Sequence, residues 1–473
     1  MKKILLTISV LVLAAAVLGA QSRTSYFVRN STQSHYLNPA FVPDQGYIGV
    51  PLLNGFDIQL ATNYGPTTFL FPLSNGKTGL FLNSEVSPEL FLSGLKNDSY
   101  TDFSFGYNLV DVGWFTRKDS FWTLSLGLDV NMDSSIPLEL FRFLKCGMTT
   151  DPQSYSIQNL AIGAQAYASL ALGYSRGLDE FVKGLRVGGK VKFLASVADM
   201  QMNVDRLDLN LSSQSWAVSS LGTMRLLGGG LSPAFDDNGY ISGVNFDPSS
   251  LGVGGFGLAF DLGAEYTISQ GTPVDGLRFS VSVTDLGFIT YSQNKSRIFT
   301  ADGTVRFEGV EHLGGEGDIN SQLEGIADEL MNLASFTEDK VDKAQNGTLA
   351  ATLHAGVDYS FLDDKMNVGL LYSARFGRFR TENELTIAWN YAPVRSFDIA
   401  LSYSLLKTHS TIGWLITFVP KKGIGIFLGS DYTPLNYTAL NIEGIKLPVP
   451  AKEVMLDVNF GLTISLGGKN RRY

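Results

Sequence analysis

The chain has 473 residues, of which 44% are hydrophobic and 12% aromatic, with 50 glycines and only 17% charged residues. Soluble domains average about 7% glycine and about 25% charged residues, so this balance fits a lipid-facing barrel better than a soluble enzyme. A formal net charge of -9 argues against nucleic acid as a partner. Cys146 is the single cysteine, which excludes a disulfide framework and a thiolate metal cluster.

The N-terminus has the form of a secretory signal. Lys2 and Lys3 precede an apolar run over residues 4–17, and Leu18-Gly19-Ala20 follows, so we expect residues 1–20 to be a signal peptide. Elsewhere the sequence lacks the 18 or more consecutive apolar residues of a transmembrane helix. An exported chain this apolar is therefore either soluble or enters the outer membrane as strands.

Residues 21–54 show no clean alternation, and they precede the convincing strands. A large barrel encloses a lumen too wide for side chains alone to fill. We therefore expect residues 21–54 to form a periplasmic N-terminal plug and residues 55–473 to form the barrel.

Apolar and polar residues alternate in long runs through the rest of the chain. Residues 121–133 place Trp122, Leu124 and Leu126 on one face and Thr123 and Ser125 on the other. Such runs reach eleven to thirteen residues, enough to cross a hydrocarbon layer at a tilt of about 45°. Strand-like runs lie near 56–64, 66–73, 78–86, 102–116, 121–133, 161–176, 185–205, 256–269, 277–291, 349–361, 366–376, 382–391, 396–406, 411–419, 423–432 and 454–467.

The connections alternate between short turns and long segments, which is typical of outer-membrane barrels with long extracellular loops. The long segments are residues 134–160, 206–255, 292–348 and 433–453. The predicted fold is all-β: a transmembrane antiparallel up-and-down β-barrel of 14 strands, with 16 allowed, an N-terminal plug and helical extracellular loops.

Three segments predict helices in the outer loops. Residues 292–348 are acidic, and the capping box Ser321-x-x-Glu324 opens a helix that forms either a lid or a solvated surface excursion. Pro88 and Pro137 each suit a first helical turn before residues 89–96 and 139–145. The aromatic side chains of the last two segments either capture a greasy ligand or pack the loops together; they are Phe91, Phe141 and Phe143.

The apolar row of residues 277–284 loses its phase at Asp285, which would then face lipid. A β-bulge over Asp285-Leu286-Gly287 restores the phase. This bulge either opens a gap in the wall or ends the membrane-spanning part.

An embedded hydrolase needs a histidine within reach of a hydroxyl nucleophile and an acid. Of four histidines, only His354 shares a strand face with an acid, Asp358, and lumen packing explains that pair better than catalysis. Metal-ligand spacing is absent. We therefore expect no enzyme activity, no catalytic residue, no metal and no cofactor. The charged inward rows suit a wet lumen, with an ion or polar-solute pathway as the alternative.

Three runs look like an uncharacterised family of outer-membrane barrels: Asn38-Pro39-Ala40-Phe41, the segment from Ile136-Pro137 to Phe143-Leu144, and Val283-Thr284-Asp285-Leu286-Gly287. With the signal peptide and the strand count, the chain resembles the related FadL-type long-chain fatty acid transporters of Gram-negative outer membranes. The resemblance implies a cell outer membrane location, a plug containing Asn38, Pro39 and Ala40, ligand capture by outer loops and sideways release at a strand kink, for which Asp285 and Gly287 are candidates.

Two functions follow as hypotheses. In the first, the barrel takes up a hydrophobic or amphipathic small molecule and contacts outer-membrane lipid. In the second, a closed barrel serves as a scaffold or cargo partner of a secretion or surface-attachment machine. An apolar cavity that runs from the outer loops past Asn38 would favour transport, and a packed lumen would favour the scaffold.

Overall fold

The computed structural model describes residues 23–467 except 52, 77, 117–118, 148–151, 213–215, 236–240, 251, 269–273, 308–334, 408–409, 435–436, 443–444 and 451–452. The expected signal peptide, the helix after Ser321, and His312 and His409 lie outside this part of the chain.

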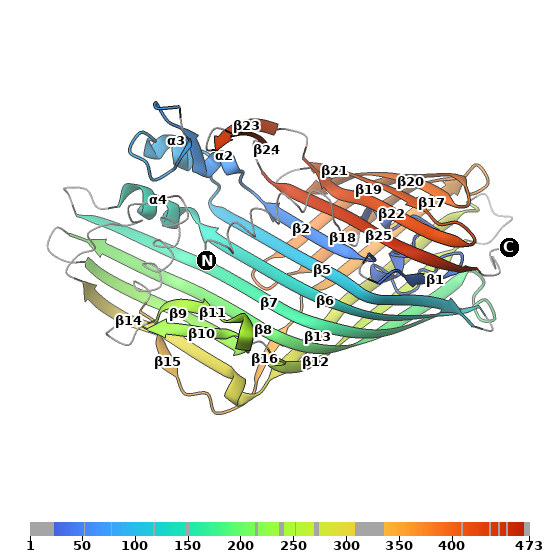
Figure 1. The fold of residues 1–473 in the computed structure, drawn as a ribbon, viewed down its shortest axis with the longest axis horizontal. Helices are drawn as coiled ribbons and strands as arrows, with labels where there is room; N and C mark the ends of the chain where they lie inside the picture. The colour runs from blue at the N-terminus through green and yellow to red at the C-terminus, as the bar shows by residue number, and fades with distance from the viewer. Residues whose placement is uncertain are drawn as a thin grey trace.

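Fourteen strands form a closed antiparallel barrel (Figure 1), as the sequence predicts. Each strand pairs with the next along the wall, and β25 closes the ring on β2. The wall strands are β2 (Phe56–Thr62), β5 (Asp98–Phe115), β6 (Ser120–Pro137), β7 (Gln153–Gly177), β8 (Leu185–Leu211), β12 (Gly255–Thr267), β13 (Leu277–Tyr291), β17 (Ala351–Phe361), β18 (Met366–Phe376), β19 (Thr381–Val394), β20 (Phe397–Leu406), β21 (Ser410–Phe418), β22 (Gly423–Thr433) and β25 (Met455–Gly467).

The first wall strand is built from two pieces. β1 (Gly46–Gly49) and β2 both pair with β25 on one side and β5 on the other, and residues 50–55 separate them. The wall thus begins at Gly46, ahead of the boundary expected at residue 55.

The strands expected near 66–73 and 78–86 are not wall strands, and this prediction is wrong. β2 ends at Thr62, and Pro66 opens a helical turn, α2 (Pro66–Phe69), because proline fixes its own φ and offers no N–H to a ladder. The remainder is a short separate hairpin of β3 (Leu70–Pro72) and β4 (Thr78–Leu80). Phe81, which follows β4, is buried in an apolar cluster that includes residues of β7 and β8.

Burial along the wall is inverted relative to a soluble protein. On β12, Phe256 and Leu262 are 69% and 59% exposed, whereas Asp261 is fully buried. The apolar rows therefore face outward and the polar rows face the lumen, as a bilayer requires. Among the described residues, no helix is both long enough and apolar enough to cross a bilayer.

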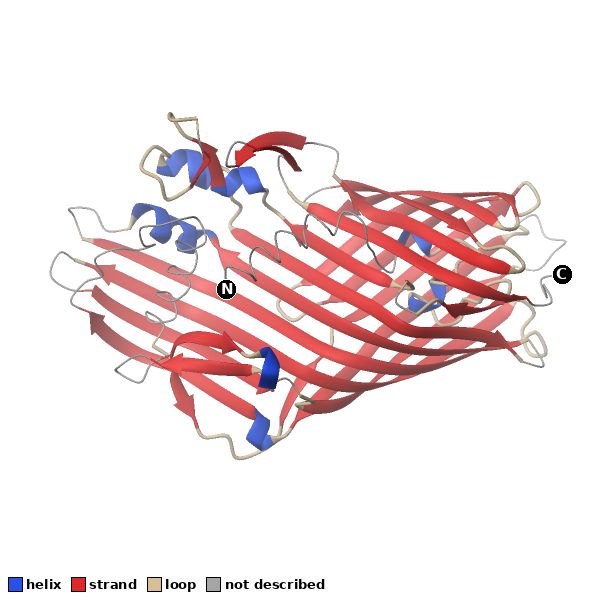
Figure 2. Cartoon of the chain, viewed as in Figure 1, coloured by secondary structure: helices blue, strands red, loops and turns tan. Residues whose placement is uncertain are grey.

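The two ends of the barrel differ. Residues 178–184, 362–365 and 419–422 form short turns at the end that also carries residue 467, and most connections at the other end are long. Figure 2 shows helices gathered beside the long-loop end, where α3 (Pro88–Ser93) and α4 (Leu138–Cys146) lie. As expected, α3 starts at Pro88, and α4 starts directly after Pro137.

At the long-loop end the wall continues as a second sheet, which we call the outer sheet. The far halves of β7 and β8 pair with each other, and β9 (Trp216–Gly228), β14 (Ser296–Phe307) and β15 (Thr337–Asp339) extend them. Segments 134–160, 206–255 and 292–348, expected as loops, thus contain strands. They also contain β10 (Leu231–Phe235), β11 (Ile241–Phe246), β16 (Gln345–Thr348), η4 (Pro248–Ser250) and η5 (Gln293–Lys295); the hairpin β23 (Tyr437–Ile442) and β24 (Ile445–Pro450) lies in segment 433–453.

The outer sheet has the polarity of a water-exposed element. Its outward face carries hydrogen-bonded polar pairs such as Ser154 with Asn210 and Ser219 with Thr304. Its inner face packs with α3 and α4 around a cluster that includes Trp216. Sequence alternation alone missed this extension because the outward row changes from apolar to polar where the strands leave the apolar band.

Candidate functional site

Residues 23–45, which we call the plug segment, lie inside the barrel. Its two short turns are η2 (Arg23–Ser25) and η3 (Ser34–Tyr36), and nearly all of its residues are buried. It hydrogen-bonds lumen-facing groups on opposite parts of the wall, among them Asp431 on β22, Asn367 on β18 and Ser175 on β7. Such contacts all around the ring require a position within the lumen.

The predicted Asn38-Pro39-Ala40 element docks onto β7, β8, β12 and β13. The Asn38 side-chain amide donates to the backbone oxygens of Ala264 and Val281 at 3.3 and 3.4 Å, and its oxygen accepts from the Ala40 N–H at 2.9 Å. A Cβ on Gly188 would overlap the Pro39 carbonyl. The backbone approach thus depends on that glycine.

The beginning of the plug segment is clamped by charges that sequence reasoning missed. Asp431 accepts from the N–H groups of Arg23 and Thr24 at 2.5 and 2.9 Å. The Arg23 guanidinium lies 3.3 Å from Glu384 and also donates to Tyr432. Two strands, β19 and β22, therefore hold this end of the plug segment.

A second clamp passes through His35. Its Nδ1 lies 2.7 Å from the Lys190 ammonium, and its Nε2 lies 2.5 Å from the Tyr47 hydroxyl, which donates to Asp111 at 3.1 Å. Because the ammonium can only donate, His35 accepts at Nδ1 and carries its proton on Nε2. This chain connects β8 to β5 through the plug segment.

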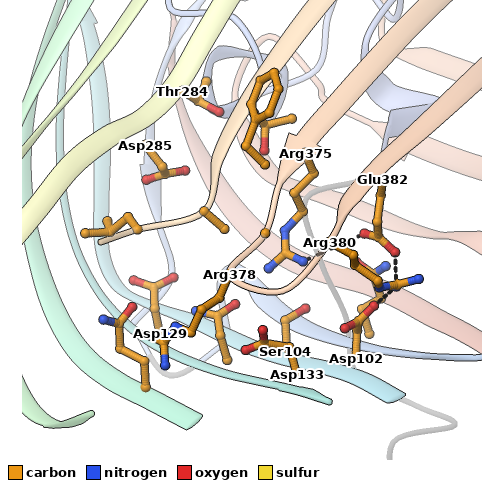
Figure 3. A pocket seen from close by; sticks show the side chains of 18 of the residues that line it. Asp102, Ser104, Asp129, Asp133, Thr284, Asp285, Arg375, Arg378, Arg380 and Glu382 are labelled. Carbon is orange, nitrogen blue, oxygen red and sulfur yellow. Dashed lines mark hydrogen bonds and ion pairs between the residues drawn. The ribbon is translucent and has the colours of Figure 1, made fainter. Parts of the chain in front are cut away.

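The structure contains the bulge expected at Asp285-Leu286-Gly287. Opposite β12, one extra residue enters β13 here, and Asp285 has a φ of 58°. Asp285 thereby turns into the lumen (Figure 3), where Lys192 lies 2.7 Å from it and 3.0 Å from the buried Asp261. At the same level, β13 changes partner from β17 to β16.

A cavity of about 280 Å³ lies between the plug segment and the β18–β19 turn. Arg23 and Leu37 border it from the plug segment, and residues 377–380 border it from the turn. Figure 3 shows its charged lining, which comes from strands all around the wall. The titratable side chains that line it are Arg23, Asp57, Asp102, Asp129, Asp133, Tyr167, Asp285, His354, Arg375, Arg378, Arg380 and Glu382.

The β18–β19 turn crosses the lumen. Arg378 reaches β8, where it lies 2.9 Å from Asp199 and donates to the Met200 backbone oxygen at 3.1 Å. Arg380 reaches β5, where it pairs with Asp102 and stacks on the Tyr100 ring. This turn, the arginine hairpin (residues 377–380), closes the cavity on the long-loop side.

The outer-loop aromatics lie inside a packed cluster. Phe91 and Phe143 are fully buried and Phe141 is 7% exposed. Phe91 contacts Phe81 and Phe141, and Phe143 contacts Tyr155 and Trp216. Their geometry matches the alternative in which they pack the loops together.

The outer sheet also carries one well-formed surface ion pair. Arg297 donates to both carboxylate oxygens of Glu338 at 2.7 Å. These two hydrogen bonds to the charged form lower the pKa of Glu338. The pair joins β14 to β15.

His354 and Asp358 have different partners. His354 Nδ1 lies 2.8 Å from the Ser373 hydroxyl, whereas Asp358 accepts from Arg278 at 2.7 Å. Arg278 also pairs with Glu265, so Asp358 belongs to an ion-pair network. Among the described residues, no group of three or more His, Cys, Asp or Glu side chains is placed to hold a metal ion.

Together, the inverted barrel and its enclosed lumen define a membrane-type β-barrel with an internal N-terminal segment. A family model described as a family of unknown function (DUF5723) matches residues 39–431, and the chain belongs to this family. No curated protein matches the sequence.

Solved structures of three channels are similar in outline. The toluene transporter TodX of P. putida has a TM-score of 0.37 and 9% identity over 93% of this chain and 95% of its own. The Ralstonia pickettii toluene transporter TbuX has a TM-score of 0.38 and 8% identity over 91% of this chain and 93% of its own. The monoaromatic hydrocarbon channel CymD has a TM-score of 0.38 and 10% identity over 95% of this chain and 98% of its own.

Proposed function

We propose that this protein is a gated channel of the outer membrane that takes up a small amphipathic molecule through its lumen. The observation that carries the proposal is the cavity, which lies between two separate inward closures. The plug segment forms one and the arginine hairpin forms the other. A compartment with a closure on each side can exchange its contents with either face in turn.

The arginine hairpin is held by polar contacts, and the plug segment combines polar contacts with a small apolar cluster of Tyr26, Phe27, Leu37 and Phe41 against the wall. The arginine hairpin depends on ion pairs with Asp199 and Asp102. The plug segment depends on Arg23, His35 and Asn38 and their partners. Water or a charged ligand can replace such contacts one at a time, which suits movement of either closure.

The lining of the cavity favours an amphipathic ligand over a purely hydrophobic one. The continuous apolar path that would favour a hydrophobic molecule does not occur among the described residues, since the cavity is lined mainly by charged and polar side chains. A pure hydrocarbon, as named for TodX and CymD, would displace the water around these charges without replacing its hydrogen bonds. A molecule with a polar group avoids that cost.

Solute flux tests the proposal. The protein, reconstituted in liposomes, is compared in swelling assays with small solutes to a double variant that carries both Arg378→Gln and Arg380→Gln. We expect the double variant to raise the flux several-fold, because the hairpin loses its anchors on β8 and β5. Arg297→Gln, on the outer sheet, is the matched control. Flux equal to that of empty liposomes for all proteins would overturn the channel proposal.

A further inference from the structure

The cations of the cavity are all paired with acids. Arg378 pairs with Asp199, and Arg23 pairs with Glu384. Arg380 pairs with Asp102 and Glu382, and Arg375 shares Glu382 at 3.8 Å. Lys192, just outside the lining, pairs with both Asp285 and Asp261.

Three acids of the same cavity have no ion pair among the described residues: Asp57, Asp129 and Asp133. Asp129 only accepts a hydrogen bond from the Ser169 hydroxyl at 3.2 Å. The Asp57 Oδ1 atom is shielded from solvent and has no hydrogen-bond partner in the described part of the chain. A buried carboxylate oxygen without a partner costs free energy in the absence of a compensating cation or donor.

Strand register brings two of these acids together. Asp57 on β2 lies opposite Gly106 on β5, and Gly106 lies opposite Asp129 on β6. Because Gly106 has no side chain, the Asp57 carboxyl group lies over it, on the strand that separates Asp57 from Asp129. Asp133 lies four residues further along β6, on the same face.

We call the wall that carries Asp57, Asp129 and Asp133 the acidic wall, and we propose that it binds the ammonium group of a small organic molecule. The inference rests on the proposed function, since it names the substrate class of the same cavity. The arginines of the cavity are paired with other acids, which leaves the three acids of this wall without a cation among the described residues, and rings of Asp and Glu favour cations in membrane pores. The cavity of about 280 Å³ has room for an organic amine.

A metal ion fits this wall less well than an amine. Metal ions require several ligand atoms within about 2–2.6 Å of one point, and the described residues contain no such group of three. An ammonium group needs only hydrogen-bond contacts, and a chain with an amine at each end can reach carboxylates that are spread along the wall. The acids of the wall therefore suit an extended organic cation.

Equilibrium binding tests the inference without requiring transport. The purified full-length barrel in detergent is titrated with 1,4-diaminobutane and with neutral 1,4-butanediol by calorimetry at about 150 mM salt, where weak surface attraction is screened. We expect binding of the diamine and none of the diol. Asp57→Asn and Asp129→Asn should each weaken diamine binding about tenfold, since a carboxylate a few ångströms from a cation contributes at least that much at a partly buried site.

Asp302→Asn is the matched control, because Asp302 is an exposed acid on β14 of the outer sheet. It should leave diamine binding unchanged. The two lumen variants should fold, because they remove acids that have no ion pair among the described residues, and migration of unheated protein on a gel reports the folded barrel. Equal affinity for diamine and diol, or unchanged binding by both lumen variants, would overturn the inference.

The two proposals fail separately. Binding of the diamine without flux in liposomes would refute the channel and leave the ammonium site. Flux that is the same for charged and neutral solutes, with no binding, would refute the ammonium site and leave the channel.

Discussion

Gly188 and Gly189 on β8 show how one atom decides whether the plug segment can dock. Gly188 faces the lumen, where a Cβ would overlap the Pro39 carbonyl. Gly189 faces outward, and its nearest neighbours would be at 3.5 Å or more. The two positions thus provide a substitution and its control on adjacent residues.

We expect Gly188→Ala to loosen the plug segment and Gly189→Ala to leave it docked. In a Cys146→Ser background, Ser34→Cys in the plug segment reports on docking, because Ser34 is 3% exposed. A small maleimide should label this cysteine several-fold faster in Gly188→Ala. Identical labelling rates in both glycine variants would contradict the assigned contact.

Replacement of Lys192 should lower the free energy of unfolding by a predictable amount. Lys192→Met leaves Asp261, which is fully buried, without its cation. Removal of one partner of a buried pair costs about 3–5 kcal/mol, and we expect the lower end because Asp285 is partly solvated. Urea unfolding in lipid vesicles measures the change. Adding Asp261→Asn should recover part of the lost stability; no recovery would locate the effect elsewhere.

At the scale of elements, α4 is an amphipathic helix that connects the wall to the outer sheet. It buries Leu140, Phe141, Phe143 and Leu144 and leaves Arg142 exposed. The helix could be predicted from Pro137 and from its apolar spacing. The burial of its aromatics could not, because it depends on the outer sheet, whose strands β9 and β14 come from segments expected as loops.

We expect Phe143→Ala to destabilise the outer sheet by about 3–5 kcal/mol, the usual cost of truncating a buried phenylalanine. Local opening should speed hydrogen exchange in α4 and β9 and leave β19 and β20 unchanged. Arg142→Ala, one residue away, is the control and should have little effect, because its ion pair with Glu139 is exposed. Equal exchange in both variants would contradict the packing role.

At the scale of the molecule, the asymmetry of the connections sets the orientation of the barrel. With long loops outside, the outer sheet faces the exterior and residues 419–422 face the periplasm. In a Cys146→Ser background, an impermeant maleimide should label Thr304→Cys on intact cells but label Lys421→Cys only after cell breakage. The opposite labelling pattern would contradict this orientation and would place the plug segment, rather than the arginine hairpin, on the exterior side.

The sequence predicted the barrel, because outward rows such as that of β6 alternate without interruption, and it favoured the observed 14 strands while allowing 16. It pointed to Asn38 and to a bulge at Asp285, but not to Arg23, the arginine hairpin or the approach of Asp57 to Asp129. These depend on which strands face each other across the lumen. Asp57 and Asp129 are far apart in the chain, and only the register through Gly106 brings them together.

β8 has 27 residues, a length of roughly 90 Å at about 3.3 Å per residue. A strand tilted by about 45° needs only 9–11 residues to cross the hydrocarbon layer. The remainder rises well past the lipid headgroups as a rigid ribbon. With the long loops outside, its polar face would stand in water beyond the membrane surface, within reach of large molecules that cannot cross the membrane.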